Sequence, residues 1–252
     1  MNTTPAPIPN VDDVACADAI LKTIASKPSL KRLYEEAYEK YNACLAKTPA
    51  NGLAIEIGSG LGFSKERVSG LISTDVLAYP GLDQIVDATK MKFADGSLRM
   101  ICMLNVFHHI PDVGAFLAEA ERCLVPGGRI LILDEHPGWI STPILKYAHA
   151  EPFEPKAQDW KFISHGPLSS ANGALAWIVF RRDFQKFTKR YPSLKLLRYE
   201  PHTPLRYWLS GGLKSWSLLP NWIFPIATVL DRGLTRLSPQ FGSFVDVEII
   251  KQ

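Results

Sequence analysis

The chain has 252 residues, of which 46% are apolar, and its formal net charge is only +3. This length and apolar content suffice to bury the core of one α/β domain with additions. Four scattered cysteines, with no C-x-x-C pair and no metal-ligand spacing, argue against a disulfide framework and favour a reducing, cytoplasmic setting.

The first fifty residues predict a helical cover. Residues 1–10 contain three prolines and predict a disordered tail, and the lack of a basic start and an apolar core predicts no signal peptide. Apolar side chains at steps of three and four predict one helix over about residues 11–26 and a second from Pro28 to about Leu45. We therefore expect residues 1–50 to pack on a main domain that spans residues 51–252.

From Leu53 the chain alternates short apolar runs with loops and helical patterns. The predicted strands are residues 53–57, 71–75, 84–86, 100–105 and 129–133. Between the last two lies a helix that Asp112 can cap and that Pro126-Gly127-Gly128 ends. Its predicted buried face consists of Phe116, Leu117, Ala120 and Leu124. Such alternation predicts a mostly parallel sheet that binds ligands at the carboxyl ends of its strands.

The chain after residue 135 has a different character. Residues 136–180 are rich in Pro, Trp and His and show little periodicity, which predicts an insertion over the active face. A helix over about residues 182–190 and a strand over residues 194–199 follow. An aromatic stretch over residues 203–240 and a last strand over residues 243–250 complete the domain.

The C-terminal part of the chain is basic and aromatic. Residues 181–252 hold 12 Lys and Arg against 5 Asp and Glu, a balance of +7. The aromatic residues of this part include Tyr207, Trp208, Trp216, Trp222 and Phe224. One interpretation is a solvated basic face beside a buried aromatic cluster, and the other is a surface for an anionic substrate or a membrane. The longest uncharged apolar run, residues 215–230, has 16 residues and two prolines, so it is too short and too interrupted to span a bilayer.

The most informative segment of the chain reads Ala54-Ile55-Glu56-Ile57-Gly58-Ser59-Gly60-Leu61-Gly62. It is an apolar strand that ends in an acidic residue and continues into a G-x-G-x-G turn, where glycines let the backbone bend sharply and approach a ligand. A carboxylate at this place suits an ammonium better than a pyrophosphate, which prefers amides and the positive end of a helix dipole. The turn therefore predicts a cofactor with a positively charged amine, although taken alone it also permits a nicotinamide dehydrogenase.

Three further segments follow the glycine turn in order. Asp75 ends the second predicted strand, residues 86–98 read Val-Asp-Ala-Thr-Lys-Met-Lys-Phe-Ala-Asp-Gly-Ser-Leu, and residues 105–112 read Asn-Val-Phe-His-His-Ile-Pro-Asp. This ordered combination, over residues 53–135, resembles the class I S-adenosylmethionine-dependent methyltransferases. The nearest resemblance is to the type 11 group, which includes the ubiquinone and menaquinone methylases. It implies a Rossmann-like α/β fold with a mostly parallel seven-stranded sheet, and S-adenosylmethionine as the cofactor, with S-adenosylhomocysteine as its product.

The resemblance also implies roles for single residues. The residues expected to hold the amino-acid end of the cofactor are Glu56, Gly58, Ser59, Gly60 and Gly62. Asp75 is expected to accept hydrogen bonds from the ribose hydroxyls. The residues expected at the adenine are Asp87, Ala88 and Thr89, and those expected beside the sulfonium are Asn105, Val106 and Phe107. Two alternatives stay open, namely Asp75 as a strand-end cap and Asp87 as a turn residue.

The chain departs from the family pattern in two gaps. The family usually has a full helix between the glycine turn and the ribose acid, and another before the adenine acid. Here only about a dozen residues fill each gap, residues 63–74 and 76–86. We expect the first helix to be cut to one or two turns and the second to be a loop, so that the adenine side of the pocket is less covered. The second helix of the N-terminal cover is a candidate to close this side.

Histidines are the candidate catalytic groups, because a neutral imidazole is a natural general base near pH 7. The resemblance favours a structural role for His109 in shaping the turn after the fourth strand. The candidate catalytic residues are therefore His108 and His136, the second of which follows the strand predicted over residues 129–133. His149 and His202 show no ligand spacing with other groups, so we expect no metal.

Methyl transfer from a sulfonium is an in-line displacement with a good leaving group. The protein has to align the acceptor and exclude water, and a base is needed only when the acceptor loses a proton. The working hypothesis is O-methylation of a saccharide or a lipid-linked sugar bound under residues 136–180 and 203–240. Two alternatives are a methyltransferase for an apolar metabolite, such as a quinone or polyketide, and a cofactor-binding protein without transfer activity.

The expected partners are the cofactor and a small molecule. Nucleic acid is not expected, because the chain has no long basic stripe. We expect a cytoplasmic protein with peripheral contact to the inner face of the membrane. The acceptor atom and the oligomeric state stay open.

Overall fold

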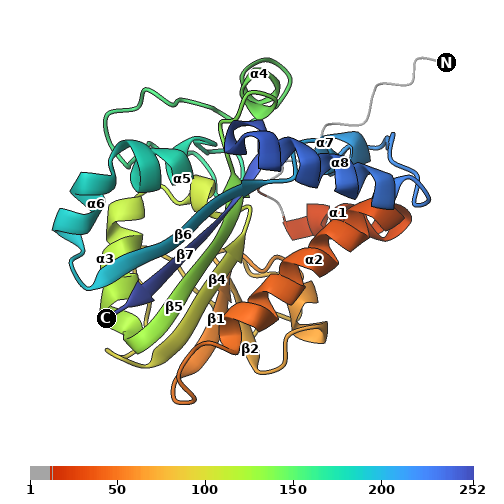
Figure 1. Cartoon of the computed structure of the whole chain (residues 1–252). Coiled ribbons are helices and arrows are strands. Elements are labelled where there is room, and N and C mark those ends of the chain that lie inside the picture. The colour runs from red at the N-terminus through yellow and green to blue at the C-terminus, as the bar shows by residue number, and fades with distance from the viewer. Residues whose placement is uncertain (1–11, 13) are drawn as a thin grey trace.

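In the computed structural model, which describes residue 12 and residues 14–252, a seven-stranded sheet has the order β3-β2-β1-β4-β5-β7-β6 (Figure 1). The strands are β1 (Leu53–Ile57), β2 (Leu71–Asp75), β3 (Gln84–Ile85), β4 (Leu98–Leu104), β5 (Leu124–Glu135), β6 (Leu194–His202) and β7 (Phe244–Lys251). Every neighbouring pair is parallel except those that β7 makes with β5 and β6. The expected mostly parallel, seven-stranded Rossmann-like sheet is confirmed.

Alternating side chains of the central strands supply the cores on both faces of the sheet, as the two-residue period of a strand requires. On one face Ile101 and Ile130 pack with α3 (Val113–Cys123) and α6 (Phe184–Arg190). On the other face Met100 and Leu131 pack against α2 (Pro28–Leu45). The α2 helix of the N-terminal cover therefore contributes to the hydrophobic core on this face of the sheet. The carboxylate of Glu56 lies on the same face.

The shortened connections are confirmed. Between β1 and β2 only a single 3-10 turn, η2 (Phe63–Glu66), is present, and the chain between β2 and β3 is a loop. The first predicted helix corresponds to η1 (Val14–Cys16) and α1 (Ala17–Ser26), while the tail predicted over residues 1–10 lies outside the described residues.

The largest boundary error concerns β5. The α3 helix ends at Cys123, whereas the sequence analysis ended it at Pro126-Gly127-Gly128, and β5 begins at Leu124. The register of the β4–β5 pair shifts between Leu98 and Met100, so the Pro-Gly-Gly segment lies within the strand as an irregularity. Gly127 has a φ of +80° there, a conformation that favours glycine. The segment is therefore a strand bend and does not cap the helix.

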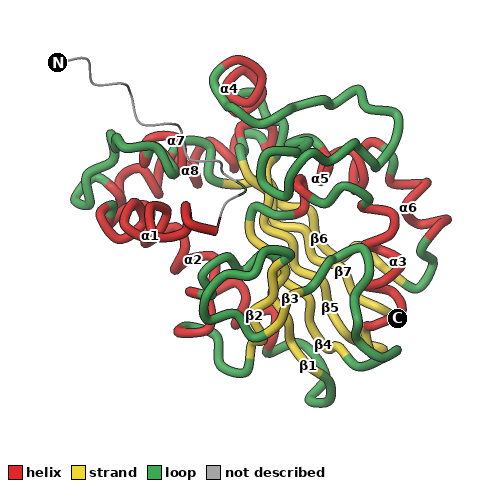
Figure 2. Tube along the Cα trace, turned by 180° about the vertical axis from the view of Figure 1, so that it is seen from behind, coloured by secondary structure: helices red, strands yellow, loops and turns green. Residues whose placement is uncertain are grey.

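The two segments predicted to cover the sheet contain more helix than expected. Residues 136–180 include α4 (Ser141–Tyr147), α5 (Leu175–Trp177) and most of a π-helical turn, η4 (Ile178–Arg182). Residues 203–240 include α7 (Arg206–Ser210), α8 (Phe224–Leu237) and most of η5 (Pro239–Phe241). Figure 2 shows the long loop between α4 and α5, and it shows α7 and α8 beside α1. Within the described residues, no helix is both long and apolar enough to cross a bilayer.

A buried ammonium joins the N-terminal cover to the α7–α8 segment. The Nζ of Lys27 donates to the carbonyl oxygens of Ser210 (3.3 Å), Gly212 (2.9 Å), Trp216 (2.7 Å) and Lys214. Burial lowers the pKa of Lys27. The backbone carbonyls of the loop after α7 therefore depend on this one side chain for their hydrogen bonds.

We expect Lys27→Met to lower the free energy of unfolding by about 2–3 kcal/mol, because it leaves buried carbonyl groups without donors. Urea denaturation at pH 7 measures the change. Lys22→Met, at an exposed position of α1, is the matched control and should change stability by less than about 0.5 kcal/mol. Equal stability of the two variants would contradict this role of Lys27.

Candidate functional site

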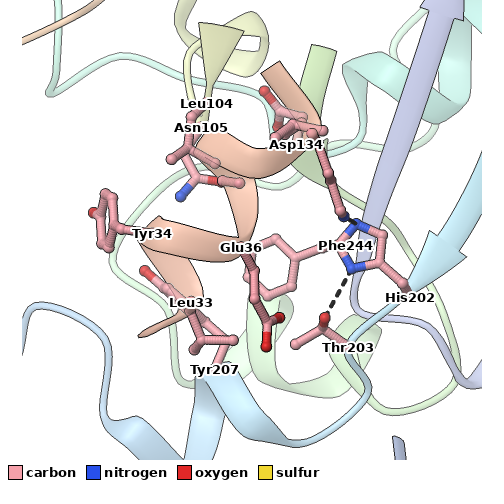
Figure 3. A pocket seen from close by; sticks show the side chains of 13 residues that line it. Leu33, Tyr34, Glu36, Leu104, Asn105, Asp134, His202, Thr203, Tyr207 and Phe244 are labelled. Atoms are coloured by element: carbon pink, nitrogen blue, oxygen red, sulfur yellow. Dashed lines mark hydrogen bonds between the residues drawn. The ribbon is translucent and has the colours of Figure 1, made fainter. Parts of the chain in front are cut away.

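A cleft of about 70 Å³ lies where β4 and β5 end (Figure 3). Leu104, Asn105 and Asp134 form its floor at the carboxyl ends of these strands, α2 supplies Tyr34, and the segment after β6 supplies Tyr207. Seven of the thirteen lining residues are apolar or aromatic, and the polar ones are Glu36, Lys40, Asn105, Asp134, His202 and Thr203. The cleft therefore occupies the edge of the sheet that the sequence analysis assigned to the ligand.

The glycine turn is held in place by the side chains of β2 and its own serine. The Gly60 N–H donates to Asp75 Oδ2 (2.9 Å), and the Thr74 N–H donates to Ser59 Oγ (3.0 Å). Gly58 has a φ of +69°, and a Cβ at this position would lie 2.3 Å from a methyl carbon of Val106. Only glycine fits at residue 58, because the turn packs directly on the segment that follows β4.

The carboxylate of Glu56 lies buried under the glycine turn with 4% of the residue exposed. It accepts a hydrogen bond from Ser64 Oγ on η2. Burial raises its pKa, the hydrogen bonds oppose this, and the negative charge of Asp75 raises it further. Burial also raises the pKa of Asp75, against its backbone hydrogen bonds. Two neighbouring carboxylates with raised pKa values form a place where a positively charged group is stabilised.

Asp75 and Asp87 make local hydrogen bonds in this structure. Asp75 Oδ1 accepts from the Leu77 N–H (3.0 Å) while its other oxygen accepts from Gly60. Asp87 Oδ1 accepts from the backbone N–H (2.8 Å) and the hydroxyl (2.7 Å) of Thr89. The two alternatives left open, a strand-end cap and a turn residue, therefore agree with these contacts. Each carboxylate keeps further lone pairs, and their contacts to ribose and adenine stay predictions, as does the place of Ala88.

Asn105, at the floor of the cleft, has a strained backbone conformation. Its φ is +54°, which is uncommon for a residue other than glycine. Its Oδ1 is buried and has no hydrogen-bond partner among the described residues. Strain and an unpaired buried oxygen together mark a place where a ligand can bind.

One of the residues expected beside the sulfonium has a side chain in the core. Phe107 is fully buried, and its ring packs against Phe116 and Phe180 in the core. The turn at Asn105 directs this aromatic side chain into the α3 face of the sheet, and a place of Phe107 beside the sulfonium stays a prediction. Val106 contributes the contact to Gly58 described above.

His136 is also placed away from the cleft. Its ring is buried, it contacts the ring of Tyr199 edge-on, and its Nδ1 lies 2.9 Å from Tyr199 Oη. Burial lowers its pKa to about 4, with a smaller effect of Arg181. The expectation that this side chain faces the substrate is not met, because the end of β5 turns beneath β7 at this point, where the His136 N–H donates to the Ser243 carbonyl (2.9 Å).

His108 and His109 are both tied to their surroundings through Nδ1. His108 is buried with Nδ1 2.6 Å from Asp134 Oδ1 and Nε2 3.1 Å from Glu151 Oε2. His109 Nδ1 donates to the carbonyl of Ser170 (2.9 Å), which agrees with a turn-shaping role. Of the two, His108 is linked to the cleft, because Asp134 lines it.

A polar group that was not predicted from the sequence lies at the other end of the cleft. His202 Nε2 lies 2.8 Å from Asp246 Oδ1, which also forms an ion pair with Lys40 (2.8 Å). His202 Nδ1 lies 2.8 Å from the hydroxyl of Thr203, whose φ is +47°. Burial disfavours the charged form of Asp246, but His202 and Lys40 outweigh it and hold the pKa of this carboxyl well below its usual range.

No local spacing could have revealed this group. His202 ends β6 and Asp246 lies on β7, so their contact depends on the antiparallel pairing of these strands. Lys40 comes from α2, far away in the sequence. The available signal was a histidine and a threonine at the end of a predicted strand.

Parts of the chain are similar in sequence to known proteins. Residues 56–132 match the family model described as "Methyltransferase domain". The chain is 32% identical to the chloroplastic tocopherol O-methyltransferase of Arabidopsis thaliana over 27% of its length, and 26% identical to the ubiquinone/menaquinone biosynthesis C-methyltransferase of Desulfotalea psychrophila over 41% of its length. The chain spans only 20% and 49% of these two relatives.

A solved structure shares the fold. The geranyl diphosphate C-methyltransferase of Streptomyces coelicolor, solved with S-adenosylhomocysteine bound, superposes with a TM-score of 0.52 at 18% identity. The match covers 92% of this chain and 82% of that protein. At this identity the match describes the fold alone, including the antiparallel last strand.

Proposed function

The chain belongs to the class I S-adenosylmethionine-dependent methyltransferases, and on that premise we propose that it transfers a methyl group from S-adenosylmethionine to a small molecule in the cleft. The observation that carries the proposal is the buried carboxylate of Glu56 beneath the glycine turn. A buried carboxylate with a raised pKa is suited to pair with the cofactor's ammonium. The cofactor supplies a methyl group already activated by the sulfonium.

The residues of the chain then bind the cofactor, orient the acceptor and exclude water. Glu56 and the turn of Gly58, Ser59, Gly60 and Gly62 would receive the amino-acid end of the cofactor. Asp75 would receive the ribose, and Asp87, Ala88 and Thr89 the adenine. Asn105 would offer its unpaired oxygen at the floor of the cleft, where β4 ends. The apolar walls beyond it would hold the acceptor and exclude water from the reacting atoms.

The acceptor is, in this proposal, an apolar ring or isoprenoid compound that carries a hydroxyl group. Tyr34, Leu104, Leu133, Tyr207 and Phe244 give the cleft an apolar lining. The named relatives are a tocopherol O-methyltransferase and a ubiquinone/menaquinone biosynthesis C-methyltransferase, and the structural neighbour is a geranyl diphosphate C-methyltransferase. These names favour the apolar metabolite over the saccharide that was the first expectation from the sequence.

We assign the general base to His202. Asp246 accepts the Nε2–H of this imidazole, which leaves Nδ1 to accept a proton through the Thr203 hydroxyl. An acceptor hydroxyl that contacts Thr203 would pass its proton to the hydroxyl oxygen as the Thr203 proton moves to Nδ1. The acceptor oxygen would then attack the methyl carbon as the bond from that carbon to sulfur breaks.

Exposed apolar side chains follow the segment that supplies Tyr207 to the cleft. They suit an enzyme whose apolar acceptor resides in a membrane. Those on the loop after α7 and on α8, here named the α8 surface, are Leu213, Trp216, Leu218, Trp222, Ile226, Val229, Leu230 and Leu237. The exposed charges between residues 203 and 240 are all basic, namely Lys214, Arg232 and Arg236. Tryptophan and apolar side chains flanked by basic residues are typical of surfaces that bind anionic bilayers.

We expect the chain to bind vesicles that contain anionic phospholipid, and we expect Leu218→Ser with Trp222→Ser to lower the bound fraction about 10-fold or more. Each of these side chains, 69% and 74% exposed, would contribute about 1.5–3 kcal/mol when it enters the bilayer. Co-sedimentation with phosphatidylglycerol-containing vesicles measures binding. Leu197→Ser, on edge strand β6, is the control. Equal binding to purely zwitterionic vesicles would remove the electrostatic part of this proposal.

The experiment that tests the function uses S-adenosylmethionine labelled in its methyl group. The purified chain is incubated with an organic extract of membranes or with a water-soluble saccharide fraction, and the label is followed into products. We expect label in the organic extract. Label in the saccharide fraction alone would restore the first expectation, while cofactor binding with no label in either pool would favour a protein without transfer activity.

A further inference from the structure

Three ligand-type atoms converge behind the cleft, on the far side of Asp134. The Nε2 atoms of His108 and His109 lie 3.1 Å and 3.7 Å from the same oxygen of Glu151. All three atoms lie within 4.8 Å of one another. The histidines come from η3 (Phe107–His109), just after β4, and Glu151 comes from the loop between α4 and α5.

The hydrogen bonds of the two rings determine which nitrogen is available. His108 Nδ1 faces a carboxylate oxygen of Asp134, and His109 Nδ1 faces the carbonyl oxygen of Ser170, and both partners are acceptors. When an ion replaces the proton that His108 Nε2 donates to Glu151, each ring keeps its proton on Nδ1 and presents the lone pair of Nε2. Metal-binding histidines are almost always held in this way, by a carboxylate or a backbone carbonyl on the other nitrogen.

The neighbouring Glu135 brings a second buried carboxyl group close to Glu151. Its side chain is 6% exposed, and its Oε2 has no hydrogen-bond partner among the described residues. Its Oε1 lies 4.0 Å from His149 Nε2, and ligand atoms of Glu135, His149 and Glu151 lie within 4.8 Å of one another. A buried, unpaired carboxylate oxygen costs several kcal/mol unless a proton or a cation satisfies it.

We propose that His108, His109 and Glu151 bind one divalent ion of the first transition row. Two imidazoles and a carboxylate form a donor set that Zn²⁺ and Fe²⁺ accept. Around an ion at about 2.1 Å from each donor, neighbouring donor atoms lie about 3.0–3.4 Å apart. The spacings of 3.1 Å and 3.7 Å require only small movements to reach this geometry.

His149 stands beside this set as a hydrogen-bonding partner. The Glu151 N–H donates to His149 Nδ1 (3.4 Å), so the neutral ring carries its proton on Nε2, toward Glu135. The ring would orient the Glu135 carboxylate. The bound ion would fasten the α4–α5 loop to the end of β4. The acid that holds His108, Asp134, is also a wall of the cleft, so the site adjoins the acceptor.

The test is metal binding by the untagged full-length chain after treatment with a chelator and dialysis. We expect elemental analysis after equilibration with Zn²⁺ to give one ion per chain. His109→Ala and Glu151→Gln should each weaken binding at least 10-fold. His165→Ala, at an exposed position of the same loop, should leave it unchanged. Co²⁺ should give the visible absorption of a four- or five-coordinate ion in the unaltered chain and lose it in Glu151→Gln.

A second measurement guards against variants that merely unfold. Circular dichroism should show folded variants, and Zn²⁺ should raise the melting temperature of the unaltered chain and of His165→Ala only. Substoichiometric metal, below about 0.1 ion per chain, or equal affinity in all variants would overturn the proposal. The cluster would then be held by a doubly protonated His108, whose Nδ1–H donates to Asp134 and whose Nε2–H donates to Glu151. Neither result depends on cofactor or methyl transfer, so the proposed function stands or fails separately.

Discussion

Glu56→Gln is expected to raise the dissociation constant of S-adenosylmethionine about 30-fold or more. The substitution keeps the shape of the side chain and removes its negative charge. Loss of one partner from a buried, hydrogen-bonded charge pair costs about 2–5 kcal/mol, and 1.4 kcal/mol corresponds to a factor of ten in affinity. Because Glu56 is 4% exposed, solvent cannot replace the lost interaction.

Isothermal titration calorimetry measures this effect, and the chain offers a matched control. Glu66 lies on η2, ten residues further along, and is exposed. Glu66→Gln should therefore leave the affinity within about 2-fold, the range of ordinary surface substitutions. Removal of the buried carboxylate should also raise the free energy of unfolding of the unliganded protein, since the raised pKa of Glu56 signals an unfavourable burial. Equal affinities of the two variants would show that the cofactor's ammonium lies elsewhere.

His202→Gln is expected to lower the rate of methyl transfer about 100-fold to 10,000-fold, the range that general-base catalysis supplies. Thr203→Val, which removes the hydroxyl and keeps the side-chain volume, should have an effect in the same direction. The dissociation constant of S-adenosylmethionine should stay within about 2-fold in both, because neither residue contacts the glycine turn. Label transfer into the organic extract gives the rate, and His165→Ala is the control. Full activity of His202→Gln would contradict the assignment and would point to an acceptor that needs no base.

Asp246→Asn tests the contacts of His202 and Lys40 with Asp246 through the free energy of unfolding. Burial opposes the charge of Asp246, yet His202 and Lys40 lower its pKa in the folded chain, so its ionised form stabilises the fold. With a depressed pKa, this stabilisation is fully present above the unfolded value of about 3.9 and is lost as the pH falls below it. We therefore expect Asp246→Asn to cost about 2–3 kcal/mol at pH 7, less at pH 3. Urea denaturation at the two pH values measures the difference, and a pH-independent loss would argue against the ion pairs.

The sequence was sufficient to predict the central strands and the glycine turn. The strands β1 and β2 have the predicted limits, because each is an apolar run bounded by turn residues, and Asp112 Oδ1 accepts from the Ala115 N–H (2.9 Å) as the predicted cap of α3. The start of β5 was missed because Pro126-Gly127-Gly128 is a usual helix stop. Only the pairing of Leu124 with Leu98 shows that the strand begins before it.

The site residues also divide into those that local sequence places together and those that only tertiary contacts bring together. Glu56, Ser59 and Gly60 follow one strand directly, so local spacing places them together. The burial of the Phe107 side chain was not foreseen, because the positive φ of Asn105 changes the direction of the chain, which no residue pattern indicates. The contacts of His202 with Asp246 and of His108 with Glu151 join segments 44 and 43 residues apart. Such contacts arise from strand pairing and loop packing, and the side-chain period of a single sequence does not encode them.

The most direct test of the account is calorimetric titration of the purified full-length chain with S-adenosylhomocysteine. The account predicts one site per chain with a dissociation constant below about 100 μM, which corresponds to a binding free energy of about −5.5 kcal/mol or stronger. It also predicts that S-adenosylmethionine competes for the same site. No heat and no rise in melting temperature at about 1 mM ligand would contradict the claim that the Glu56 turn binds this cofactor.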